Sequence, residues 1–304
     1  MRVQDEPLRI RQSSIRLFLS CRRSWWMTYA DAYQPRAEEE ADANGRANLG
    51  TLVHAGLESH YKDDGSDPFR AMIDLVPIDD TIGAMSDAWA KELKWATVML
   101  EGYLEWVELE GKDIGRKVIA TERSWEVPYY IRGQQVIVHG TSDLTTREAL
   151  YGNRVVITDH KTVQNYGNLP RQVDWQLLTY ALAYWRVSGE VPTRVEHNML
   201  RKVLRTKPSD IPFYDRFGLA ITEEQLEKHE KHLLVVLDEM VGLWQSVSSV
   251  DDPRLYPNPS AEHCRFCNFK ELCSVVDDGD WEHVLELNYE RPVVSPQPES
   301  REAP

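Results

Sequence analysis

Cysteine, long apolar stretches and a surplus of positive charge are scarce or missing in this sequence. Four cysteines among 304 residues are too few for a disulfide scaffold. No stretch comes near the ~20 apolar residues that a membrane-spanning helix needs, and the run from Leu233 to Leu237 is stopped by Asp238. The first residues, MRVQDEPLRIRQSS, lack the apolar centre of a signal peptide. We therefore expect a protein of the reducing cytoplasm with no membrane partner.

The charge balance excludes further classes of protein. Lys and Arg number 35 against 49 Asp and Glu, which gives a net charge of −14 and argues against a generic basic coat on nucleic acid. The sequence has no G-x-x-x-x-G-K-[ST] loop, so it carries no helicase motor, and any helicase is a separate partner. A hydrophobic share of 42% with 10 Trp predicts a packed core.

Apolar spacing along the chain predicts an α/β protein. The first third has helical periodicity, and beyond it the period changes to two before a helix returns. We predict helices over residues 14–29, 48–62, 86–110 and 171–189 and from 222 onward, and strands over 117–127, 134–144, 154–162 and 193–203. The expected regions are an N-terminal arm (1–12), a helical region (13–112), a core (113–250), a cysteine segment (251–288) and a disordered tail (289–304).

Acidic residues and a lysine lie at strand ends of the predicted sheet. Asp159 and Lys161 follow the apolar run VVIT two residues apart, so they project from one face of a strand. Asp143 ends the preceding strand in GTSDL, which places two carboxylates on adjacent strands where they can share a divalent metal. Each residue alone also fits a simpler role, an exposed ion pair for D-x-K and a turn residue for Asp143.

Polar residues on two predicted helices are further site candidates. Gln176 and Tyr180 are four residues apart on one helix face, from which they can hold a phosphate or orient Lys161. Their simpler interpretation is a helix edge and the rim of the core. His54 lies at the edge of an apolar helical stripe, a position that can face a cleft. Glu122 is interpreted as a polar residue alternating along a strand, with a supporting role behind the metal ligands as the alternative.

The cysteines are concentrated near the C-terminal end. Cys264, Cys267 and Cys273 form a tight group, and Cys21 is the only cysteine left to supply a fourth thiolate. Thiolates in a cytoplasmic protein bind metal more often than they form disulfides. On the residues alone, an iron–sulphur cluster and structural zinc, for which His263 is a spare ligand, are about equally compatible with this set.

A short basic stretch follows the fourth predicted strand. It contains Arg201, Lys202 and Arg205, and we expect these residues to follow a nucleic-acid backbone while nearby aromatic side chains stack on bases. A solvated charged face is the common alternative for such a run.

The segments GTLVHAGLE, ATERSWEV, GTSDL, ITDHKT and QLLTYALAY occur in this order, and over residues 13–273 the chain resembles the RecB-like branch of the PD-(D/E)XK nuclease superfamily. The resemblance implies a restriction-endonuclease-like αβββαβ core with a mixed sheet flanked by helices. It implies that Lys161 is catalytic and that Gln176 and Tyr180 support it. The metal ligands implied are His54, Asp143, Asp159, which replaces the Glu of many relatives, and the carbonyl oxygen of His160.

The arrangement of one N-terminal and three C-terminal cysteines resembles AddB-type nuclease domains and CRISPR-associated RecB-like exonucleases. This implies a [4Fe–4S] cluster on Cys21, Cys264, Cys267 and Cys273, with structural Zn²⁺ as the alternative. We therefore expect a Mg²⁺- or Mn²⁺-dependent DNA exonuclease that prefers single-stranded ends, with 5′→3′ polarity. The alternatives are a structure-specific endonuclease and a non-catalytic DNA-binding subunit. Partners from repair, recombination or CRISPR adaptation are equally compatible with the motifs.

Overall fold

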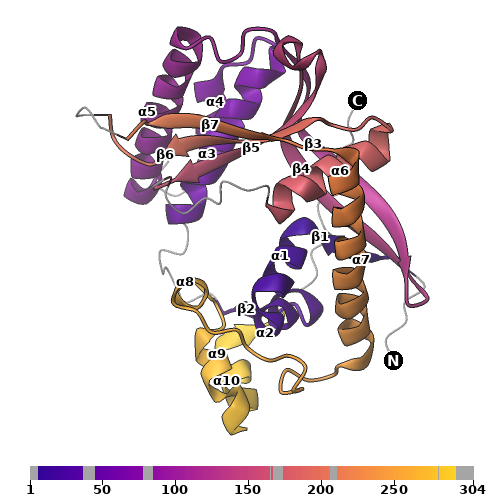
Figure 1. The fold of residues 1–304 in the computed structure, drawn as a ribbon. Coiled ribbons are helices and arrows are strands. Elements are labelled where there is room, and N and C mark those ends of the chain that lie inside the picture. The colour runs from indigo at the N-terminus through magenta and orange to yellow at the C-terminus, as the bar shows by residue number, and fades with distance from the viewer. Residues whose placement is uncertain are drawn as a thin grey trace. The chain divides into compact units, whose positions relative to one another are not determined.

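A computed structural model describes residues 6–36, 45–77, 85–164, 166, 174–205, 211–279 and 281–291. The chain divides into two compact units (Figure 1). The unit that we call the core unit comprises residues 42–125 and 141–227, and the cysteine unit comprises residues 1–41, 126–140 and 228–304. Two long strands, β3 (Arg116–Ile131) and β4 (Gln134–Glu148), contribute to both. None of the helices in the described ranges has the length and apolarity that crossing a membrane requires.

The sheet of the core unit is mixed. The second part of β4 pairs antiparallel with β5 (Arg154–Val163), β5 pairs parallel with β6 (Arg194–Arg201), and β6 pairs antiparallel with β7 (Tyr214–Ala220). A short 3-10 turn, η2 (Ala149–Tyr151), joins β4 to β5. The run VVIT in β5 is buried on both faces, as expected for a central strand covered by helices on each side.

Helices cover the two faces of this sheet. His160 of β5 stacks on Tyr61 of α3 (Gly45–Lys62), whereas its neighbour Lys161 contacts Gln176 of α6 (Trp175–Ser188). Because successive strand residues point to opposite faces, α3 and α6 lie on opposite sides of β5. α4 (Pro68–Ile73) and α5 (Asp87–Leu109) pack with α3 around a buried apolar cluster that includes Leu52, Leu57, Leu100 and Tyr103.

The cysteine unit combines both ends of the chain. β1 (Leu8–Arg11) pairs parallel with the first part of β4, and β2 (Gln34–Pro35) pairs antiparallel with β8 (Tyr289–Glu290). Most of the long helix α7 (Glu223–Ser246) belongs to the cysteine unit, and its first residues belong to the core unit. It begins with a capping box in which Thr222 and Gln225 bond each other's backbone N–H groups. The remaining elements are α1 (Gln12–Ser20), α2 (Arg22–Trp25), η1 (Trp26–Ala30), α8 (Ala261–Arg265), α9 (Lys270–Val275), η4 (Val276–Asp278) and α10 (Trp281–Asn288).

The predicted order of three strands, a helix and a fourth strand is confirmed, and so is the capping box. The strands β1 and β7 and the helix α4 were not predicted. Residues 128–131, predicted as a connection, extend β3 up to a turn at Arg132 and Gly133. The predicted helix over 14–29 is interrupted at Cys21, whose backbone is extended. Of the predicted tail, residues 289–290 form β8 and residues 292–304 lie outside the described residues.

Candidate active site and cysteine cavity

The pairing of β4 with β5 brings Asp143 close to the centre of the third predicted strand. The backbone N–H of His160 donates to Oδ2 of Asp143 over 2.6 Å. Burial, and after it the nearby negative charge of Asp159, raise the pKa of Asp143 to about 7. A carboxylate that is held in a buried place beside other carboxylates is stabilised by a cation.

His54 of α3 faces the same carboxylates. Its Nε2 lies 3.1 Å from the carbonyl oxygen of His160. A carbonyl can only accept, so Nε2 carries the proton and Nδ1 is the nitrogen left for another partner. This Nδ1 lies 3.7 Å from Oδ2 of Asp143 and 3.7 Å from Oε1 of Glu122. Burial lowers the pKa of His54, but the two carboxylates outweigh it and the net shift is upward.

The side chains of His54, Glu122 and Asp143 fit a divalent cation. Their three ligand atoms lie within 4.8 Å of one another. Two carboxylate oxygens suit Mg²⁺ or Mn²⁺, and an imidazole nitrogen shifts the preference toward Mn²⁺. The carbonyl oxygen of His160, expected from the resemblance to bind metal, accepts from His54 here, and its role as a ligand stays an expectation.

The structure places Glu122, interpreted from the sequence as a polar residue alternating along a strand, beside His54 in the group that fits a cation. The backbone of Glu122 has a φ of +42° within β3, a conformation that costs energy for a residue with a side chain. Before Glu122 the even-numbered residues from Arg116 to Ala120 are the less exposed ones. Beyond it the odd-numbered Trp125 and Val127 are buried, so the alternation of the strand shifts by one residue. Such a phase change re-aims side chains, as a β-bulge does.

Lys161 is fixed by contacts to both sides. Its Nζ lies 2.9 Å and 2.8 Å from the two oxygens of Asp159 and donates to Oε1 of Gln176 over 2.9 Å. The Nε2 of Gln176 in turn donates to the hydroxyl of Tyr180 over 2.7 Å. Burial raises the pKa of Tyr180, so its phenol stays neutral. The four residues therefore form one connected polar chain from β5 to α6.

His197 of β6 was not singled out from the sequence, and it touches this chain. Its Nδ1 donates to Oδ2 of Asp159 over 3.0 Å, and its Nε2 lies 3.3 Å from Oδ2 of Asp174. Burial lowers the pKa of His197, but its contacts with Asp159 and Asp174 raise it further, to about 9. The imidazole is therefore charged at neutral pH.

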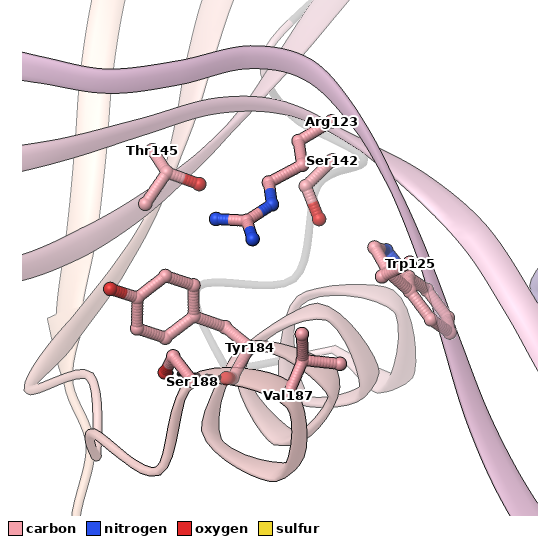
Figure 2. Close-up of a pocket in the computed structure, with 7 residues that line it drawn as sticks. All are labelled: Arg123, Trp125, Ser142, Thr145, Tyr184, Val187 and Ser188. Atoms are coloured by element: carbon pink, nitrogen blue, oxygen red, sulfur yellow. Dashed lines mark hydrogen bonds between the residues drawn. The ribbon is translucent and has the colours of Figure 1, made fainter. Parts of the chain in front are cut away.

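Two hollows adjoin these residues. An open cleft of about 530 Å³ extends from His54 and Glu122 along α3 to Leu75. A second hollow, of about 20 Å³, has room for one water molecule (Figure 2). In Figure 2 the Arg123 guanidinium reaches between Thr145 and Tyr184. Trp125 lines this hollow and makes an edge contact with the Tyr180 ring, with ring centres 6.0 Å apart.

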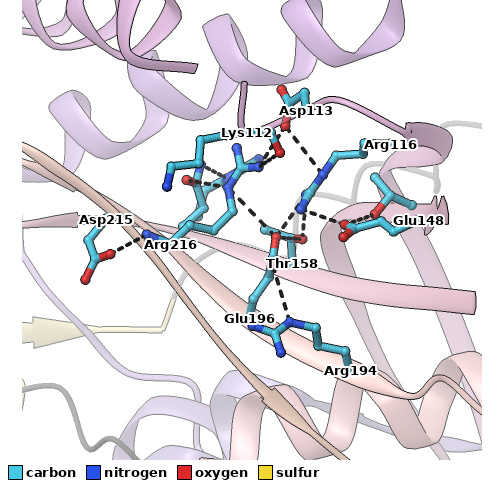
Figure 3. A network of polar contacts seen from close by, with 12 residues as sticks. Lys112, Asp113, Arg116, Glu148, Thr158, Arg194, Glu196, Asp215 and Arg216 are labelled. Atoms are coloured by element: carbon cyan, nitrogen blue, oxygen red, sulfur yellow. Dashed lines mark hydrogen bonds and ion pairs between the residues drawn. The ribbon is translucent and has the colours of Figure 1, made fainter. Parts of the chain in front are cut away.

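A separate network of charged residues lies in the same unit (Figure 3). The guanidinium of Arg116 donates to Glu196 over 2.9 Å and lies 2.6 Å from Glu148. Arg216 donates to Asp113 over 2.7 Å and to the hydroxyl of Tyr103 over 2.6 Å. Asp113, Glu148 and Glu196 thus each have a guanidinium beside them.

All four cysteines line one cavity of about 340 Å³ in the cysteine unit. None of them forms a disulfide. The buried Arg23 donates over 3.7 Å to Sγ of Cys273 and over 2.8 Å to Asp277. The hydroxyl of Ser24 lies 3.7 Å from Sγ of Cys267. Because a guanidinium stabilises a thiolate, this surrounding suits sulphur ligands of a metal. His263, the spare zinc ligand, also lines the cavity.

The basic residues expected at a nucleic-acid backbone have partners within the protein. Arg205 forms an ion pair with Glu105 over 2.7 Å, and Lys202 lies 3.6 Å from Glu92. Arg201 is buried, and its guanidinium donates to the carbonyl oxygen of Ile211 over 2.8 Å. Their role in binding nucleic acid stays an expectation.

Comparison with known proteins gives one extensive family match. The profile described as "PD-(D/E)XK nuclease superfamily" matches residues 9–274. No curated protein matches the sequence. Among solved structures, one from Eubacterium rectale, named as a candidate exonuclease, is 12% identical with a TM-score of 0.46 over 82% of this chain and 89% of its own. The structure of SSO0001 is also 12% identical, with a TM-score of 0.32 over 86% of this chain and 93% of its own.

Proposed function

Because this chain belongs to the PD-(D/E)XK nuclease superfamily, we propose that it is a divalent-metal-dependent deoxyribonuclease that degrades DNA from single-stranded ends with 5′→3′ polarity. The observation that carries this proposal is the placement of two sets of side chains around one strand, β5. One set is His54, Glu122 and Asp143, whose ligand atoms gather within 4.8 Å. The other is Lys161 with Asp159, held by Gln176.

The residues have separate tasks in phosphodiester hydrolysis. His54, Glu122 and Asp143, with Asp159 beside them, would hold a Mg²⁺ or Mn²⁺ ion, which would supply a water of lowered pKa and polarise the phosphate. Lys161 offers its ammonium group to the developing negative charge on a nonbridging oxygen. Gln176 restricts the lysine to one position, and Tyr180 restricts Gln176. The open cleft beside His54 and Glu122 leaves room for the DNA strand.

The substrate preference is tested with 5′-labelled linear single-stranded DNA and closed circular single-stranded DNA in Mn²⁺. We expect the linear strand to release its label at once in short products, while the circle stays intact. Lys161→Met removes the ammonium group, and we expect a loss of about 100-fold or more. Lys91→Met, an exposed lysine on α5, is the matched control and should retain full activity. Cleavage of the circle would establish an endonuclease, and an inert wild type that still binds DNA would establish a non-catalytic subunit.

We further propose that Cys21, Cys264, Cys267 and Cys273 hold a [4Fe–4S] cluster. A zinc ion with Zn–S bonds of about 2.3 Å would draw its four thiolates to within about 4 Å of one another. Among the described residues, no three of these sulphur atoms gather within 4.8 Å, although all four line a cavity of about 340 Å³. The wider arrangement favours a group larger than a single ion.

The metal content of anaerobically purified protein tests the cluster. We expect about four iron and four sulphide per chain with little zinc, and loss of the iron in Cys21→Ser. Ser274→Ala, which changes another residue lining the same cavity, should retain the iron. One zinc per chain without sulphide would replace the cluster by a structural zinc site.

A further inference from the structure

His197 lies beside Asp159 because β5 and β6 pair in parallel with these two residues in register. Both side chains are buried, with 2% of His197 and 1% of Asp159 exposed. The hydrogen bond from Nδ1 of His197 to Oδ2 of Asp159 is 3.0 Å long. No solvent reaches this carboxylate to hold its orientation, so its protein partners decide where its oxygens point.

We propose that His197 is a positioning residue for the nuclease reaction, which holds the carboxylate of Asp159 in one orientation through Nδ1. The inference rests on the proposed function, in which Asp159 and Lys161 act together. Lys161 approaches both carboxylate oxygens at 2.8 Å and 2.9 Å, so it does not distinguish them. His197 contacts Oδ2 alone and comes from a strand of the sheet, which makes it the less mobile partner.

The second nitrogen of His197 suggests a competing role. Nε2 lies 3.3 Å from Asp174 but lacks a hydrogen bond of good geometry in the described residues. Asp174 is the N-cap of α6, where its Oδ1 accepts from the backbone N–H of Leu177 over 2.8 Å. α6 also carries Gln176, which binds Lys161. His197 therefore contacts the reacting carboxylate through one nitrogen and the helix cap through the other.

Two substitutions separate these roles. The amide nitrogen of Asn is as many bonds from Cα as Nδ1 of His, and that of Gln is as many as Nε2. His197→Asn therefore keeps a donor for Asp159, whereas His197→Gln keeps only the donor for Asp174. We expect kcat of the Asn variant to stay within about threefold of wild type, and kcat of the Gln variant to fall 10- to 100-fold with an unchanged KM for DNA.

Mn²⁺ binding can be measured without catalysis, because the electron paramagnetic resonance signal of the free ion is lost when the ion binds. We expect about tenfold weaker binding by His197→Gln and unchanged binding by His197→Asn. If the two variants differ in Mn²⁺ binding as expected but the wild type cleaves no DNA, the proposed function fails and the positioning role of His197 stands. Equal losses in the two variants, or a larger loss for Asn, would overturn the inference.

Asp174→Asn covers the case in which both histidine variants fail to fold. Asn is as good an N-cap as Asp, so α6 keeps its cap while the charge facing Nε2 is removed. We expect kcat and Mn²⁺ binding within about threefold of wild type, because Asp159 keeps its bond to Nδ1. A loss of tenfold or more would show that the contact with the helix cap is the one that matters, and would overturn the inference.

Discussion

The core unit contains two sets of buried and half-buried charged side chains, and they differ in how their charges are balanced. In the network of Figure 3, Glu148 and Glu196 both lie within 3 Å of Arg116. In the candidate active site, Glu122 and Asp143 face a single imidazole, that of His54, at 3.7 Å. In the first set the carboxylates are neutralised by arginine side chains of the protein. The second set has the space and the negative charge to bind an added cation.

This difference separates a structural set of charges from a functional one. A buried carboxylate that is already paired gains little from a metal ion, and removing its partner leaves an uncompensated charge. A buried carboxylate without a close cation makes the metal-free protein less stable, and that cost is recovered when a cation binds. Stability and metal dependence should therefore respond in opposite ways to substitutions in the two sets.

The largest effect is expected from Arg116→Met in the network. This change leaves Glu148 and Glu196 buried without their shared guanidinium, and we expect a loss of about 3–5 kcal/mol in the free energy of unfolding. Urea denaturation measures it. Arg70→Met, which breaks the exposed pair with Asp74, is the control and should change stability by less than ~1 kcal/mol. Similar small losses in both variants would show that the network does not stabilise the fold.

Asp143→Asn should have the opposite effect on stability. The pKa of Asp143 is raised from 3.8 to about 7 in the folded protein. The folded protein thus favours the protonated form of Asp143. Its contribution to the free energy of unfolding is fully present below about pH 4 and is lost as the pH rises through 7. At pH 8 without metal, we expect the Asn variant to be more stable by on the order of 2 kcal/mol, because it has no charge to bury. Saturating Mn²⁺ should remove this advantage, and a destabilised variant would contradict the comparison.

The pH dependence of Mn²⁺ binding tests whether the candidate active site, unlike the arginine network, takes up an added cation. Protons compete with the cation for Asp143, whose pKa is about 7, and for His54, whose pKa is also raised. Below pH 7 we therefore expect affinity to fall at least tenfold per pH unit, or ~1.4 kcal/mol. Calorimetric titration between pH 5.5 and 8 measures it. A flat profile would mean that the cation does not bind at these residues.

The smallest effect is expected in the cysteine unit, where Arg23 is both paired with a carboxylate and in contact with a proposed metal ligand. It pairs with Asp277 and also donates to Sγ of Cys273. Removing its positive charge in Arg23→Gln makes reduction of the proposed cluster less favourable by about fivefold, or ~40 mV at 59 mV per tenfold change. Redox titration measures the shift. Arg265→Gln is the control, and an equal shift there would mean that Arg23 has no special role.

Local spacing was enough to find part of the site. The contacts of Lys161 with Asp159 and Gln176 join residues within one strand and the next helix, where periodicity places them. The place of Glu122 beside His54 goes with a positive φ within β3, which periodicity alone does not give. His197 was missed because its contact with Asp159 depends on the register of β5 and β6. Likewise, the partners of Lys202 and Arg205 come from α5, about 100 residues away.

Cys21, at the extended break between α1 and α2, lies far in sequence from the other three cysteines of its cavity, and this separation matters for synthesis of the protein. Cys21 is made before the core unit, whereas Cys264, Cys267 and Cys273, which line the same cavity, are made after it. Until then the nascent chain contains only one of the four proposed ligands. A chain released before residue 264 therefore could not assemble the proposed metal group, and retention of that group would mark a chain that was translated through both parts of the cysteine unit.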